Sequence, residues 1–125
     1  MSVKINFDHA RQVWEETTSV IAVWCFGSAM DGIVNQGSDL DIAVLFSSTP
    51  SLDQLATLRA SHQEVFNIDD IDLMILNSAN TISGMEAVSG KSIFCRDVET
   101  RAEFVSLLAR QYEDDMAFLE KSLLY

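Results

Sequence analysis

Two points of the chain carry aspartates spaced for chemistry, Asp39-Leu40-Asp41 and Asp70-Ile71-Asp72. The chain holds eleven aspartates, so about one bare Asp-x-Asp is expected by chance and the motif alone indicates nothing. The first pair differs because Gly27-Ser28 precedes it by ten residues. A Gly-Ser, ten residues and an Asp-x-Asp are expected together only roughly 0.004 times in a chain of this composition. This combined pattern is therefore the strongest functional signal in the sequence.

The spacing of Asp39 and Asp41 indicates metal-assisted phosphate chemistry. Side chains alternate across a strand, so these two carboxylates project from the same face, about 6.6 Å apart along it. Two such charges repel each other, and a divalent cation with oxygen ligands, such as Mg²⁺, reverses the sign of the interaction. Asp72 stands in the apolar run 71–76 and can complete a two-metal site for in-line attack on a phosphate. We expect its neighbours Asp69 and Asp70 to be a solvated lead-in to that strand.

Gly27 and Ser28 predict the phosphate side of such a site. A glycine lets a phosphate approach the backbone closely, and the serine hydroxyl is a hydrogen-bond donor; we place both at a helix N-terminus. The following loop, 29–38, contains no Arg or Lys and carries Asp31. The charge of a triphosphate must therefore be neutralised by metal ions, by Lys91 or by an Arg from elsewhere in the chain.

The elements that position these residues follow from the apolar pattern. Continuous apolar runs predict strands, and caps followed by apolar residues at helical spacing predict helices. The predicted strands are 20–26, 39–46, 71–76 and 92–95, and the predicted helices are 8–18 (capped by Asp8), 51–66, 78–89 (weak) and 98–124. Because helices and strands interleave, we expect an α/β (α+β) fold in one domain, 1–125, with a mixed sheet of four or five strands and a long C-terminal helix.

Composition limits which partners and which cellular location this domain can have. The net charge of −11 disfavours general nucleic-acid binding and favours divalent cations or a basic partner. No apolar run is long enough to span a membrane, the first residues lack the apolar segment of a signal peptide, and we expect a cytoplasmic protein. Cys25 and Cys95 fall in apolar strands and are predicted to be reduced core thiols, while His9 and His62 are predicted to be structural.

Gly27-Ser28, Asp39-Leu40-Asp41 and Asp72 together resemble the signature of the DNA polymerase β-type nucleotidyltransferase superfamily. The short length, and Gly90-Lys91-Ser92-Ile93-Phe94-Cys95 before a long helix, resemble its minimal nucleotidyltransferase (MNT) branch, which includes antitoxins of HEPN toxins. The resemblance implies the nucleotidyltransferase fold, with Asp39 and Asp41 holding Mg²⁺ and the triphosphate. It implies that Asp72, also a metal ligand, helps to activate the attacking hydroxyl. Gly27, Ser28 and Ser38 are then the predicted nucleotide-binding residues.

By the same resemblance, the expected function is an antitoxin that transfers AMP from ATP to a tyrosine of a HEPN ribonuclease. One alternative is a catalytically silent antitoxin that blocks the toxin by contact, and a weaker one is nucleotidyl transfer to a small molecule. Residues 98–124 carry apolar side chains on more than one helical face, which predicts a surface for a partner or for self-association, as hetero-oligomer or homodimer.

Overall fold

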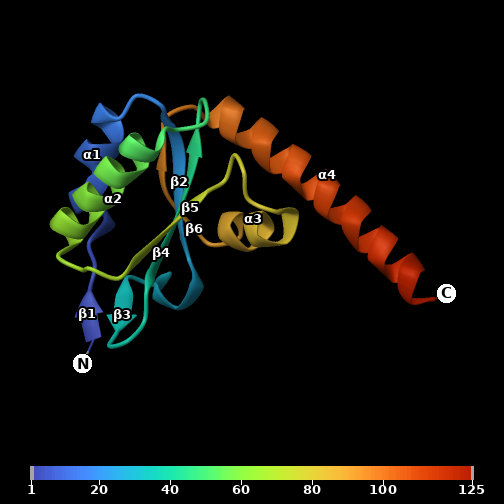
Figure 1. The fold of residues 1–125 in the computed structure, drawn as a ribbon, viewed down its shortest axis with the longest axis horizontal. Coiled ribbons are helices and arrows are strands. Elements are labelled where there is room, and N and C mark those ends of the chain that lie inside the picture. Colours follow the sequence, from blue (N-terminus) through green and yellow to red (C-terminus); the bar gives the residue numbers. More distant parts are fainter. Residues whose placement is uncertain (1, 125) are drawn as a thin grey trace.

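A computed structural model describes residues 2–124 (Figure 1). Its elements, in chain order, are β1 (Ser2–Lys4), the 3₁₀ turn η1 (Phe7–Ala10), α1 (Arg11–Glu16), β2 (Val20–Phe26), the 3₁₀ turn η2 (Gly27–Ala29), β3 (Ile33–Asn35), β4 (Leu40–Phe46), α2 (Leu52–Phe66), β5 (Ile71–Ile75), α3 (Thr81–Val88), β6 (Lys91–Cys95) and α4 (Val98–Leu123). No helix in this described range is long and apolar enough to cross a membrane.

The main sheet is mixed and has four strands in the order β5-β4-β2-β6. The two central strands, β2 and β4, run antiparallel, β6 is antiparallel to β2, and β5 is parallel to β4. The predicted mixed sheet flanked by helices, with a long C-terminal helix, is therefore confirmed. Strands β1 and β3 pair separately as a two-stranded antiparallel sheet.

Helices cover both faces of the main sheet, which explains the unbroken apolar runs of its central strands. Helices α1 and α2 pack on one face, and α3 with the first half of α4 packs on the other (Figure 1). Every residue of β2 is buried, and β4 is buried except at Asp41, where it is half-exposed. Burial of a strand on both faces favours continuous hydrophobic sequence over alternation.

Local signals fix α2 where the sequence predicts it. Ser51 accepts the backbone N–H of Gln54, and the Gln54 side chain accepts the backbone N–H of Ser51, so a complete capping box starts the helix. The helix ends at Asn67, which adopts the left-handed conformation that Asn tolerates (φ 54°).

The predicted N-terminal helix 8–18 is wrong in its start and its cap. The chain forms a 3₁₀ turn first, and the α-helix runs only from Arg11 to Glu16. Asn6, not Asp8, is the capping residue, and its side chain accepts the N–H of Asp8 at 3.0 Å. Asn and Asp are equally good caps, so residue type alone could not distinguish the two positions.

The predictions for the cysteines and for His62 agree with the structure. Both cysteines are free thiols as predicted, with Cys25 buried and Cys95 half-buried. His62 is fully buried against Trp14, in keeping with a structural role, whereas His9 is exposed.

Candidate functional site

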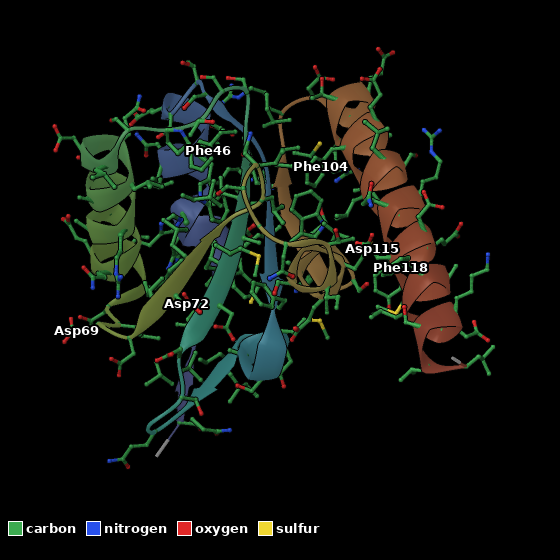
Figure 2. All side chains as sticks on the ribbon, turned by 45° about the vertical axis from the view of Figure 1, so that its right-hand side comes forward. Phe46, Asp69, Asp72, Phe104, Asp115 and Phe118 are labelled. Atoms are coloured by element: carbon green, nitrogen blue, oxygen red, sulfur yellow. The ribbon has the colours of Figure 1, made fainter. Side chains whose placement is uncertain are left out.

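Asp41 and Asp72 lie side by side on neighbouring strands. In the parallel pairing of β4 and β5, Asp41 is the register partner of Asp72. Both alternate with residues of the core under α1 and α2, such as Leu40 and Ile71, so the two carboxylates emerge on the opposite face, toward α3. Figure 2 shows Asp72 on the sheet, whereas Asp69 points outward at its edge. Asp39 lies one residue before β4 and is exposed.

Gly27 brings the turn after β2 directly against these carboxylates. Phe26, the last residue of β2, is the register partner of Asp41. Gly27 has φ +75°, and a Cβ placed on it would lie 2.3 Å from Oδ2 of Asp41. Both the positive φ and the closeness require glycine here. The Cys25 thiol donates to the carbonyl of Ala29 at 3.5 Å, which ties the turn back to its strand.

The predicted helix N-terminus at Gly27-Ser28 is wrong. Gly27–Ala29 is a three-residue 3₁₀ turn followed by the short strand β3, which the sequence analysis also missed. Ser28 is exposed on this turn. Any phosphate near it would therefore meet turn backbone and one hydroxyl, not the aligned N–H groups of an α-helix.

The electrostatics of the carboxylate group favour a cation. The pKa of Asp41 is raised, first because burial penalises the charged form, then because of Asp72, Asp39 and Glu86. Glu86 belongs to α3 and was not predicted as a site residue. Its helical segment reads only as weakly helical in the sequence, so no pattern placed it near the carboxylates.

The other residues considered in the sequence, Ser38, Asp70 and Lys91, line two pockets that do not include the carboxylates Asp39, Asp41 and Asp72. Ser38 and Asp70 line a pocket of about 420 Å³ between the loop after β3 and the start of β5. The carbonyl of Asp70 accepts the N–H of Leu40 at 2.9 Å, which locks the starts of β4 and β5 together. Lys91 pairs with Cys25 in the sheet and therefore lies on the other face, with its ammonium 5.4 Å from the centre of the Phe7 ring. Lys91 thus does not face the carboxylates.

The donor set at Asp41 and Asp72 fits Mg²⁺ bound together with a phosphate. Within residues 2–124, no three His, Cys, Asp or Glu side chains are grouped so that they could hold a metal ion. Mg²⁺, however, is usually held by one or two carboxylates plus substrate phosphates, not by an all-protein cage. The adjacent pair Asp41 and Asp72, with Asp39 close by, supplies the hard oxygen ligands of that mode.

A mixed four-stranded sheet with acidic residues at the mouth of two parallel strands and a Gly-Ser turn beside them defines a nucleotidyltransferase fold. The family model of "Polymerase beta, Nucleotidyltransferase" matches residues 9–99, and the chain belongs to this family. No curated protein sequence matches it.

Three solved structures that resemble this chain are of toxin–antitoxin systems. A chain of a toxin–antitoxin crystal structure with AMP-PNP is 20% identical, with a TM-score of 0.70 over 95% of this chain and 99% of that one. A chain of a variant MntA–HpeT toxin–antitoxin is 22% identical, with a TM-score of 0.69 over 96% and 99%. A third, from tri-AMPylated Shewanella oneidensis HEPN toxin in complex with MNT antitoxin, is 19% identical, with a TM-score of 0.56 over 90% and 98%. At these identities the likeness establishes the fold.

Proposed function

We propose that the protein is an Mg²⁺-dependent antitoxin that transfers AMP from ATP to a tyrosine of a partner HEPN ribonuclease toxin. The observation that carries the proposal is the Asp41–Asp72 register pair with Gly27 packed against it. Family membership supports nucleotidyl transfer, and the toxin–antitoxin complexes with AMP-PNP and a tri-AMPylated toxin support the substrate and the partner.

In this proposal Asp41 and Asp72, with Asp39 close by, would hold Mg²⁺ together with the phosphates of ATP, and the bound ion would supply positive charge against those phosphates. Gly27 leaves room for the triphosphate, Ser28 donates a hydrogen bond to it, and Ser38 contacts the nucleotide. The tyrosine oxygen attacks the α-phosphorus in line, the bond between the α- and β-phosphates breaks, and pyrophosphate leaves.

Asp72 has a second role in the proposal. Its carboxylate takes the proton of the tyrosine hydroxyl as the new phosphorus–oxygen bond forms. Asp72 is exposed, which lets a residue of a partner protein reach it.

Intact-mass analysis of the partner HEPN toxin tests the proposal. After incubation with this protein, ATP and Mg²⁺, the toxin mass should rise by one or more AMP groups, and peptide mapping should find them on tyrosine. The variant Asp41→Asn should give no mass change. An unmodified toxin in the presence of all components would contradict the proposal.

A silent antitoxin that acts by contact is the second candidate, and one observation favours it. All residues of α4 from 117 to 123 are exposed, and apolar side chains stand among them. An exposed apolar surface on a helix that extends beyond the body of the molecule suits a partner-binding role without chemistry (Figure 1).

A further inference from the structure

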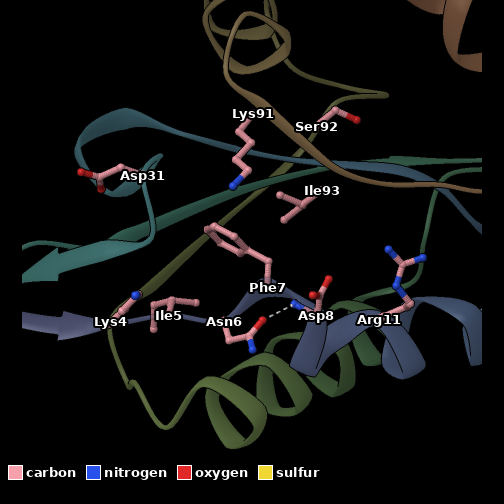
Figure 3. Close-up of a pocket in the computed structure, with 10 residues that line it drawn as sticks. All are labelled: Lys4, Ile5, Asn6, Phe7, Asp8, Arg11, Asp31, Lys91, Ser92 and Ile93. Atoms are coloured by element: carbon pink, nitrogen blue, oxygen red, sulfur yellow. Dashed lines mark hydrogen bonds between the residues drawn. The ribbon is translucent and has the colours of Figure 1, made fainter.

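Besides the carboxylate face, the molecule has a pocket of about 680 Å³ on the opposite face of the sheet. It lies between the N-terminal segment and the start of β6 (Figure 3). Pockets of roughly 300–1,000 Å³ are the size that takes small organic ligands. Its lining does not include Asp39, Asp41 or Asp72.

Cations gather at this pocket in a strongly acidic protein. Lys4, Arg11 and Lys91 line it, three of the eight basic residues in a chain of net charge −11. Two carboxylates, Asp8 and Asp31, also line it, so its charged groups sum to one positive charge. One oxygen of Asp31 already accepts the N–H of Ile33 at 3.0 Å. The lining of the pocket is therefore slightly positive in a protein whose net charge otherwise repels anions.

The three basic side chains of the pocket lie around the ring of Phe7. Figure 3 shows the Lys91 side chain pointing toward Phe7, with Lys4 and Arg11 to either side of that ring. The Lys91 ammonium lies 5.4 Å from the ring centre, a distance at which the ring holds a cation. Phe7 and the half-buried Ile93 give the same pocket an apolar surface. A ligand that satisfies both features carries a phosphate and an apolar or aromatic group.

We propose that this pocket binds a small organic phosphate, with the phosphate on Lys91 and Arg11 and the organic group against Phe7. The site is distinct from the carboxylate face, because residues that alternate along β2 point to opposite sides of the sheet: Lys91 pairs with Cys25, and Asp41 pairs with Phe26.

Removal of divalent metal by a chelator distinguishes ligand binding in this pocket from binding at the carboxylates. Without a divalent cation the carboxylates repel a phosphate, whereas Lys91 and Arg11 carry permanent charges. Calorimetry in EDTA at low salt, with AMP, adenosine and inorganic phosphate as probes, should therefore detect AMP binding. Adenosine, which lacks the charge, and inorganic phosphate, which lacks the aromatic group, should each bind more weakly than AMP.

Matched variants assign the binding to residues. Lys91→Gln and Arg11→Gln should each weaken AMP binding about tenfold, as expected for one lost hydrogen bond to a charged group. Lys91→Arg should restore it, and Lys121→Gln, in the last turn of α4, should leave it unchanged, as should Asp41→Asn.

Several results would overturn the inference: no AMP binding in EDTA, equal affinity for adenosine or phosphate, or no effect of Lys91→Gln and Arg11→Gln. AMP binding that needs Mg²⁺ and disappears in Asp41→Asn would place the ligand at the carboxylates instead. None of these results depends on toxin modification, so the proposed antitoxin activity can fail or succeed independently.

Discussion

At the scale of single residues, a comparison of Gly27 with Gly37 separates the effect of backbone strain from the effect of a collision with Asp41. Both have positive φ, +75° and +84°, yet a Cβ at Gly37 would meet nothing within 4 Å, whereas one at Gly27 would collide with the Asp41 carboxylate. Backbone strain from alanine should be similar at the two positions, on the order of 1–2 kcal/mol. Only the substitution at Gly27 should also displace a site carboxylate.

We therefore expect Gly27→Ala to lose Mg²⁺-dependent ATP binding, while Gly37→Ala keeps it. Thermal unfolding should report a drop in Tm for both variants, larger for Gly27→Ala because of the added collision with Asp41, and calorimetry with ATP and Mg²⁺ should distinguish them. Equal ATP affinity in the two variants would mean that contact between Gly27 and Asp41 has no part in nucleotide binding.

Asp41 itself should weaken the fold when no metal is present. Its pKa is raised in the folded state, so the folded protein binds the proton more tightly than the unfolded chain does. The free energy of unfolding then falls as pH rises from the unfolded value near 3.8 through the raised pKa, and the deficit persists at neutral pH.

Accordingly, Asp41→Asn should raise Tm at pH 7 in EDTA and should abolish the increase in Tm that Mg²⁺ gives the native protein. Asp114→Asn, an exposed change on α4, should leave both quantities as they are. A lower Tm for Asp41→Asn in EDTA would show that its charge does not oppose folding.

At the scale of elements, a buried hydrogen bond joins α1 to α2. The Trp14 indole N–H donates to Nε2 of His62 at 2.8 Å, and Nδ1 of His62 lies 2.8 Å from the carbonyl of Leu58. This arrangement requires the neutral imidazole with its proton on Nδ1. Burial lowers the pKa of His62 from 6.5 to about 4.

Because the pKa of His62 is lowered in the folded state, the contact between α1 and α2 should lose stability in acid. His62 contributes fully to stability above pH 6.5, and the contribution is lost as pH falls toward 4, at a total cost of about 3 kcal/mol. Urea unfolding at pH 7 and pH 4.5 should show the native protein losing more stability than His62→Gln does. His9→Gln, a change at the exposed histidine, should match the native protein at both pH values.

Helices and strands differ in how well the sequence predicts them. Elements with a clear local signal are predicted almost to the residue: β2 by its apolar run, α2 by its capping box and α4 by its long series of apolar residues at helical spacing. Strands β1 and β3 have three residues each and pair across about thirty positions, so neither has a local signature.

Of the candidate site, the strand spacing predicts that Asp39 and Asp41 share a face, whereas the pairing of Asp41 with Asp72 needs β4 and β5 to be neighbours, parallel and in one particular register. The position of Glu86 near Asp41 depends on how α3 packs on the sheet, and the face on which Lys91 lies depends on how β6 pairs with β2. Neither can be predicted from one segment alone. The turn at Gly27 was placed correctly but assigned to a helix, because glycine and serine suit both a helix start and a tight turn.

At the scale of the whole molecule, the two halves of α4 differ. Phe104 and Val105 pack on the core formed with α3, and Figure 2 shows Phe104 directed toward the sheet. Beyond residue 116 the helix leaves the body, and Phe118 and Leu123 are 71% and 88% exposed. Changing Phe118 and Leu123 together to Ser should therefore alter the free energy of unfolding by no more than about 1 kcal/mol, within the range for two surface positions.

This double variant and Asp72→Asn test the two antitoxin mechanisms from opposite sides. If α4 docks the toxin, the double variant should lose toxin binding in calorimetry while its ATP binding stays native. Asp72→Asn keeps the size of the side chain but removes its basic oxygen, so it should bind toxin normally. Its rate of toxin AMPylation should fall roughly 10²–10⁴-fold, the range for a lost general base.

Protection of cells that express the toxin then decides between chemistry and contact. Chemical neutralisation requires both variants to fail, the first because the toxin is not recruited and the second because it is not modified. Should Asp72→Asn bind, fail to modify and still protect fully, contact alone would neutralise the toxin and the catalytic role would be refuted.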